Sequence, residues 1–162
     1  MTMFKKILVG VDGSDYANKA LKAAVRLAKA YDAELAVFHA IERLPARLPL
    51  PVAQAVPVGA RVMFVDSKLY STRDVMLDAG RQVIDQARKI VIAIDSRYDT
   101  RVKFDLVNAP SPVEYAVKYA KMNVVDLIVV GCHGHHATRR EYLGSIAARL
   151  LNDAPCAVLV VR

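Results

Sequence analysis

The chain has 162 residues, of which 54% are hydrophobic, and its formal net charge is +7. This length predicts one domain over residues 1–162, and no apolar run approaches the roughly 20 residues of a membrane span. The start MTMFKKILVGVDGS turns polar too early for a secretory signal, and Cys132 and Cys156 form neither a CxxC pair nor a disulfide framework, so we expect a cytoplasmic protein.

The positive charge raises the question of nucleic-acid binding. Basic residues are scattered along the chain and mostly alternate with Asp or Glu in helical patterns, as on solvated helix faces. Basic strands carrying aromatic side chains that stack on bases are absent from the sequence. We therefore expect no nucleic-acid partner, although the charge favours anionic ligands.

The first 41 residues predict a strand, a helix and a second strand. Lys6–Val11 is a short apolar run that ends at turn formers, and Tyr16–Tyr31 carries apolar residues at helical spacing. Ser14 or Asp15 would cap this helix. Glu34–Ile41 is apolar on both faces, which is typical of a parallel strand covered by helices.

A proline-rich segment then interrupts the pattern. Residues 42–66 hold four prolines between Arg43 and Gly59 and lack sustained periodicity, so we expect a long variable loop. From Ser67 to about Ser96, apolar residues recur at helical intervals, interrupted only by Gly80.

The remaining elements continue the alternation of strands and helices. They are predicted at Arg101–Val107 (strand), Val113–Met122 (helix), Asp126–Gly131 (strand), Ser145–Leu151 (helix) and Cys156–Val161 (strand). The alternation predicts an α/β fold, a single doubly wound domain whose five-stranded parallel sheet has helices on both faces. Such sheets bind ligands beyond the carboxyl ends of their strands, where Asp12, the Asn108 turn and the Gly131 loop lie.

A glycine pattern follows the fourth predicted strand: Gly131-x2-Gly134-x9-Gly144-Ser145. Glycines permit positive φ and close approach to an anion, and a Gly-Ser at a helix start offers N–H groups and a hydroxyl. The pattern indicates a phosphate cradle or, alternatively, ordinary turns and a capped helix. The dinucleotide fingerprint G-x-G-x-x-G, the P-loop and the esterase motif G-x-S-x-G are all missing.

Four blocks of the chain resemble one known family. VGVDGSDYANKAL, AVFHAI, DLIVVGCHGH and APCAVLVVR, together with the glycine pattern, are similar to the universal stress protein family and its ATP-binding branch. The resemblance covers the chain from end to end and implies the strand order 3-2-1-4-5.

The resemblance also implies a set of nucleotide-binding residues. Asp12 would lie against adenosine and the backbone of Ala40 against adenine, although Asp12 could be a plain turn or cap residue and Ala40 plain core. The glycine loop would hold ribose and phosphates. The complete set is Asp12, Ala40, Gly131, His133, Gly134, Gly144, Ser145 and Ile146.

Three positions depart from the family pattern. Ala147 stands where many ATP-binding relatives have Ser or Thr, and Cys132 replaces a usual serine with a weaker hydrogen-bonding group. The third departure is the turn Asn108-Ala109-Pro110, where the family commonly has Gly-x-Pro. These changes make nucleotide affinity a separate question from family membership.

Other side chains near the glycines allow alternative interpretations. His133 has a counterpart in many relatives, which implies loop structure or a phosphate contact. His135 and His136 lack carboxylate or cysteine neighbours at zinc spacing, so we expect no metal site. Arg139 and Arg140 are either phosphate partners or a solvated face.

The expected function is that of an ATP-binding regulatory or stress-response module with no catalytic residues and at most slow hydrolysis. Mg²⁺ or Mn²⁺ would bind through the phosphates. The apolar C-terminal strand would form a homodimer by edge pairing, as family members commonly do, or be buried in its own sheet. Two alternatives remain: a nucleotide-free scaffold that binds a protein partner, and a sensor of AMP or cyclic AMP.

Overall fold

A computed structural model describes residues 3–42, 65–134 and 143–162, with only the backbone described for residues 65–72. Almost all of the predicted proline-rich loop lies outside these ranges. The strands are β1 (Lys6–Gly10), β2 (Glu34–Ile41), β3 (Val102–Asn108), β4 (Leu127–Gly131) and β5 (Ala157–Val161). The helices are α1 (Asp15–Tyr31), α2 (Val65–Ile94), α3 (Pro112–Asn123) and α4 (Ser145–Asp153), with a 3₁₀ turn, η1, at Asp99–Arg101.

All strand pairs are parallel, and the order is β3-β2-β1-β4-β5. The α/β class, the five-stranded parallel sheet and its order are therefore confirmed. β1 lies at the centre between β2 and β4, and β3 and β5 form the two edges.

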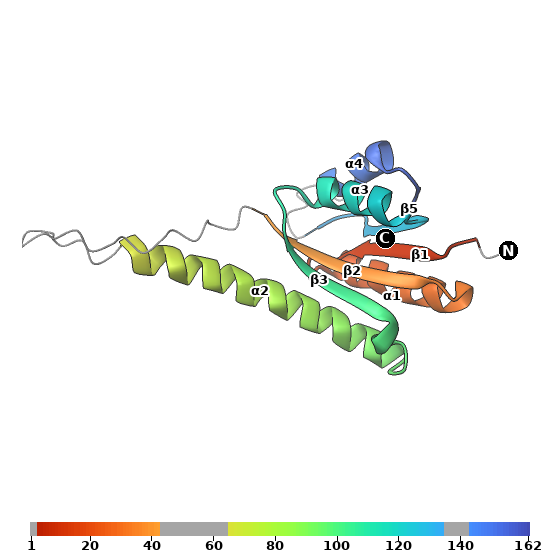
Figure 1. The fold of residues 1–162 in the computed structure, drawn as a ribbon, viewed down its shortest axis with the longest axis horizontal. Coiled ribbons are helices and arrows are strands. Elements are labelled where there is room, and N and C mark those ends of the chain that lie inside the picture. The colour runs from red at the N-terminus through yellow and green to blue at the C-terminus, as the bar shows by residue number, and fades with distance from the viewer. Residues whose placement is uncertain (1–2, 43–64, 135–142) are drawn as a thin grey trace, which may run out of the picture.

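Helices cover both faces of the sheet (Figure 1). Because side chains alternate along a strand, Ile7 and Val9 of β1 pack on one face with α1 and α2, and Leu8 packs on the other with α3 and α4. Each face therefore has its own buried apolar cluster, with the sheet between them. No helix in the described ranges is long and apolar enough to cross a membrane.

α2 is longer than the strands that it covers. Its 30 residues correspond to about 45 Å, and Figure 1 shows its N-terminal part extending beyond the sheet. The helix continues through Gly80, where an added Cβ would lie 2.7 Å from Leu106 Cδ1 and 3.0 Å from Ile41 Cδ1. Gly80 thus allows close packing of α2 against the sheet and does not end the helix.

Candidate functional site

The candidate site lies where the chain changes direction across the sheet. The chain leaves β1 for α1 on one face, and it leaves β4 for α4 on the other. In parallel sheets, this divergence between neighbouring strands opens a crevice at their carboxyl ends. Asp12 follows β1 and Gly131 ends β4, so the fold brings these two predicted residues to the carboxyl ends of neighbouring strands.

The half-buried Asp12 shapes the turn between β1 and α1. Its Oδ1 accepts the Ser14 N–H at 2.9 Å, and Gly13 between them has φ 83°. Ser14 then caps α1 by accepting the Ala17 N–H at 3.2 Å, as the sequence predicts. The alternative role of Asp12 as a turn residue is thus observed, and its Oδ2 lies next to Gly134.

Two of the glycines lie against the turn after β1 and against the first turn of α1. A Cβ added to Gly134 would lie 2.8 Å from Asp12 Oδ2, and one added to Gly131 would lie 2.7 Å from the carbonyl carbon of Tyr16. Gly131 therefore needs glycine because its neighbours are backbone atoms, whereas at Gly134 the Asp12 side chain could move aside. Among the described glycines, positive φ occurs at Gly13 and not in the pattern itself, so the predicted conformational reason for these glycines is wrong.

Gly144 connects the loop to α4. Its N–H donates to the carbonyl oxygen of Cys132 at 2.8 Å, and an added Cβ would lie 3.1 Å from that oxygen. Gly144 is the N-cap of α4 and provides no side-chain cap. The glycine pattern thus holds the start of α4 next to the end of β4.

The first turn of α4 is suited to an anion. Ser145 is exposed, Ile146 is 38% exposed, and the first turn holds no acidic residue. The first N–H groups of a helix lack acceptors within it, and the helix dipole adds partial positive charge there. Ala147, by contrast, is buried in the apolar cluster below α3 and α4, so its side chain belongs to the core.

Cys132 and His133 form a buried contact inside the loop. Cys132 Sγ lies 3.1 Å from His133 Nδ1, and the His133 ring centroid is 5.4 Å from that of Tyr16 on α1. Nε2 of His133 is buried and finds no hydrogen-bond partner within the described residues. A buried polar atom left in this state costs about 1–3 kcal/mol, so His133 is a group that gains from a further partner.

β2 supplies the third side of the site. Ala40 is half-buried, pairs with Val107 of β3 and packs against the α3 and α4 cluster. Beside it, the Nδ1–H of His39 donates to the carbonyl oxygen of Val11 at 2.7 Å, directly before Asp12. The amino-acid sequence does not predict this role of His39, because a histidine in an apolar strand gives no indication of the backbone atom that it will contact.

Several predicted features fall outside the described residues: His135, His136, Arg139 and Arg140. Within the described ranges, no group of three His, Cys, Asp or Glu side chains could hold a metal ion.

Comparison with known proteins gives a consistent result. The model of the Universal stress protein family matches residues 3–162. Universal stress protein YxiE of Bacillus subtilis is 32% identical over 162 residues, covering 99% of this chain and 100% of that protein. Universal stress protein UspA from Lactobacillus plantarum has a TM-score of 0.74 and 26% identity, with 98% of both chains covered. A universal stress protein in complex with cAMP has a TM-score of 0.62 and 22% identity, covering 98% of this chain and 97% of that one.

Proposed function

Because this chain belongs to the universal stress protein family, we propose that it binds ATP at the carboxyl ends of β1, β2 and β4. In this proposal it acts in the cytoplasm as a nucleotide-dependent regulatory module of the stress response. Adenosine lies between Asp12 and the backbone of Ala40, and the phosphates lie at the first turn of α4 beside Gly131, His133, Gly134, Gly144, Ser145 and Ile146.

The glycine contacts are the observation that carries this proposal. Gly131, Gly134 and Gly144 have neighbours so close that a Cβ would lie 2.7–3.1 Å from Tyr16, Asp12 or Cys132. Gly144 holds the uncapped start of α4 next to Cys132, which directly follows β4. Exposed helix N–H groups at a switch point of a parallel sheet are a recurrent way to bind phosphate.

Backbone binding also bears on catalysis. N–H groups stabilise phosphate charge, but they do not take a proton from an attacking water. We therefore expect little or no hydrolysis. Mg²⁺ or Mn²⁺ would enter with the nucleotide, bound through phosphate oxygens.

Calorimetry with ATP, AMP and cyclic AMP tests the proposal directly. ATP should bind the wild-type protein, and Gly144→Val should abolish binding because the valine side chain meets the Cys132 carbonyl and displaces the start of α4. Ala93→Val, on the exposed side of α2, is the matched control and should bind normally. Circular dichroism would establish that both variants are folded. Absence of binding by every nucleotide at about millimolar concentration would refute the proposal and favour the scaffold alternative.

A preference for AMP or cyclic AMP is the second candidate. The buried Ala147 offers no hydroxyl to the phosphate side of the site, while the Asp12 and Ala40 side is retained. The related fold solved with cAMP is compatible with this candidate. Tighter binding of cyclic AMP than of ATP in the same titrations would establish it. Identification of any nucleotide that co-purifies with the protein would be an independent check.

A further inference from the structure

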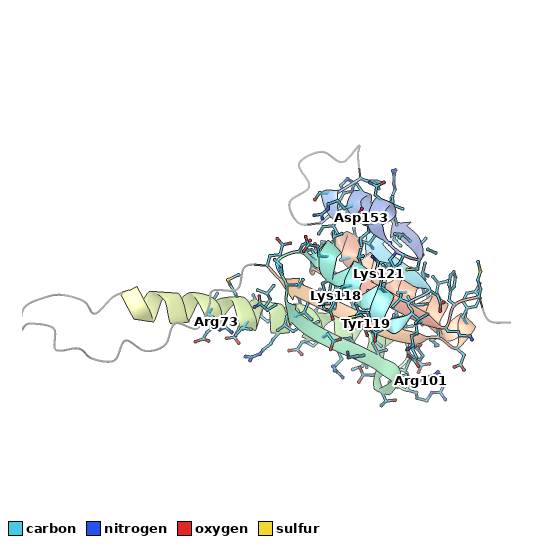
Figure 2. The ribbon with its side chains drawn as sticks, turned by 45° about the horizontal axis from the view of Figure 1, so that its top comes forward. Arg73, Arg101, Lys118, Tyr119, Lys121 and Asp153 are labelled. Atoms are coloured by element: carbon cyan, nitrogen blue, oxygen red, sulfur yellow. The ribbon has the colours of Figure 1, made fainter. Side chains whose placement is uncertain are left out.

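A hollow of about 430 Å³ lies between α3 and α4. None of its residues belongs to the proposed nucleotide site. Its lining, here called the α3/α4 groove, consists of Val113, Glu114, Val117, Lys118, Lys121, Met122, Arg149 and Asp153. Figure 2 shows Lys118 and Lys121 on α3 and Asp153 on α4 on the same side of the molecule.

The groove combines apolar and charged side chains. Val113 is buried and Val117 half-buried, while Met122 is 73% exposed at the end of α3. An exposed methionine beside a hollow is an adaptable apolar contact for a partner. The spacing of Val113, Val117 and Lys121 runs along one side of α3, so the groove follows the helix axis.

The charged residues of the groove are available for binding. Lys118, Lys121, Arg149, Glu114 and Asp153 are exposed, and no ion pair in the described part of the chain involves them. Glu114 and Lys118 are four residues apart on α3, and Arg149 and Asp153 are four residues apart on α4. Residues at this spacing on a helix can form an ion pair, but these two pairs do not.

Some basic residues elsewhere in the molecule form ion pairs. Lys103 pairs with Asp105 at 2.9 Å, and Arg101 pairs with Asp32 at 2.8 Å. The three unpaired cations of the groove exceed its two carboxylates, and the whole chain carries +7. Local and overall charge therefore both favour an acidic partner, and a second copy of this chain would bring a like charge.

The dimensions suit a helix. α3 has 12 residues, which corresponds to about 18 Å, and two adjacent helices leave a seam into which a third can pack at about 8–10 Å. We propose that the α3/α4 groove binds an acidic amphipathic helix of a partner protein. Its apolar residues contact Val117 and Met122, and its carboxylates pair with Lys118 and Arg149.

The test uses the ¹⁵N-labelled full chain and three synthetic peptides of about 14 residues. The peptides share one leucine stripe and carry Glu, Gln or Lys beside it. NMR titration should show that the Glu peptide binds at α3 and α4, at least about tenfold more tightly than the Lys peptide, and more weakly as salt rises.

Charge reversal provides the matched comparison. The double variant Lys118→Glu, Arg149→Glu should bind the Glu peptide about tenfold more weakly than the wild type does. It should also bind the Lys peptide more tightly than the Glu peptide. Lys22→Glu with Lys89→Glu, exposed residues of α1 and α2, changes the net charge equally and should leave the preference unchanged. Peptide binding is measured by NMR and nucleotide binding by calorimetry on the same wild-type chain, so the failure of nucleotide binding and that of this proposal are distinguishable.

Three outcomes would overturn the proposal. The first is equal binding of the Glu and Lys peptides, and the second is a set of shifts outside α3 and α4. The third is self-association in sedimentation runs that the Lys118→Glu, Arg149→Glu variant abolishes while the Glu peptide fails to bind. This last result would make a second copy of the chain the occupant of the groove.

Discussion

At Gly131, the absence of a Cβ allows the end of β4 to lie close to the backbone of α1. An alanine here would place its Cβ 2.7 Å from the Tyr16 carbonyl carbon and 2.9 Å from the Ala17 nitrogen. Both atoms are backbone in the first turn of α1, so they cannot rotate away as a side chain does. β4 or α1 must move instead, and overpacking of this kind costs about 1–3 kcal/mol.

We expect Gly131→Ala to lower the free energy of unfolding by about 2 kcal/mol in urea denaturation. Gly144→Ala meets the Cys132 carbonyl oxygen at 3.1 Å, so its loss should be smaller. Equal stability of Gly131→Ala and the wild type would show that the loop and α1 are less closely packed than the structure has them.

Val124 is a strained residue outside the site. It ends α3 with φ 53°, a left-handed conformation that costs a residue with a Cβ about 1–2 kcal/mol, and its side chain is 77% exposed. Asparagine tolerates this conformation better. We expect Val124→Asn to raise the free energy of unfolding by about 1 kcal/mol in urea denaturation.

Val124→Ala separates strain from exposure of the valine. Alanine also removes exposed apolar surface but retains a Cβ in the left-handed region, so its gain should be clearly smaller. A gain as large as that of asparagine would assign the effect to the side chain and not to φ.

For single residues, the sequence predicted the position in the fold better than the contacts that require the residue there. Gly131 ends β4 and Gly144 is the N-cap of α4, but a sequence shows only that a Cβ is missing at these positions. The contacts of Gly131 and Gly134 with α1 and Asp12 arise from residues more than 110 positions away. The burial of His133 beside Cys132 was likewise not visible, because polar residues in a glycine loop are typical of solvent-exposed turns.

Among the elements, β1 and β4 are joined at their starts by one carboxylate. Asp126 Oδ2 accepts the N–H groups of Lys5 at 2.7 Å and Lys6 at 2.9 Å. These backbone hydrogen bonds lower the pKa of Asp126 from its ordinary value of 3.8. The folded state therefore binds this proton less tightly than the unfolded chain does, and the stabilisation is present above the unfolded pKa.

We expect Asp126→Asn to cost about 1 kcal/mol of unfolding free energy at neutral pH, because the amide accepts these hydrogen bonds less strongly. As the pH falls through the lowered pKa of Asp126, the wild type loses the same stabilisation and the difference between the two proteins should narrow. Urea denaturation from about pH 7 down to pH 2 measures this difference. A gap that stays constant over that range would contradict the role given to the carboxylate.

Element types followed from periodicity, while the ends of elements did not. The predicted strand from Arg101 begins one residue later, at Val102, because Arg101 belongs to η1 and pairs with Asp32. The predicted helix from Ser67 begins at Val65 and ends at Ile94. Ends depend on caps and tertiary ion pairs, which hydrophobic spacing does not encode.

At the scale of the whole molecule, alternation alone predicted a parallel sheet but not its order. The order β3-β2-β1-β4-β5 came from family resemblance, and it is what places Asp12 and Gly131 at the ends of neighbouring strands. Many strand orders satisfy the same alternation, since crossover handedness restricts but does not fix them. The α3/α4 groove could not be predicted, because it depends on the side-by-side packing of two helices.

The edge strand β5 is a candidate for the contact between two copies of the chain. β5 pairs with β4 on one side only, and its Leu159 side chain is 36% exposed on the face that carries α1. An unpaired, apolar edge strand is a template for a second chain. We expect two copies to pair through β5, and Leu159→Lys to shift the protein from dimer to monomer in sedimentation velocity, since it places a charge within the apolar contact.

Val75→Lys is the control for this substitution. Val75 is 66% exposed on α2, away from β5, so the same change there should leave the dimer intact. If Val75→Lys were monomeric and Leu159→Lys dimeric, the dimer contact would lie at α2 and not at the sheet edge. A wild-type protein that stays monomeric at all accessible concentrations would exclude the β5 dimer, and the exposed Leu159 would then be an ordinary apolar side chain at the edge of a sheet.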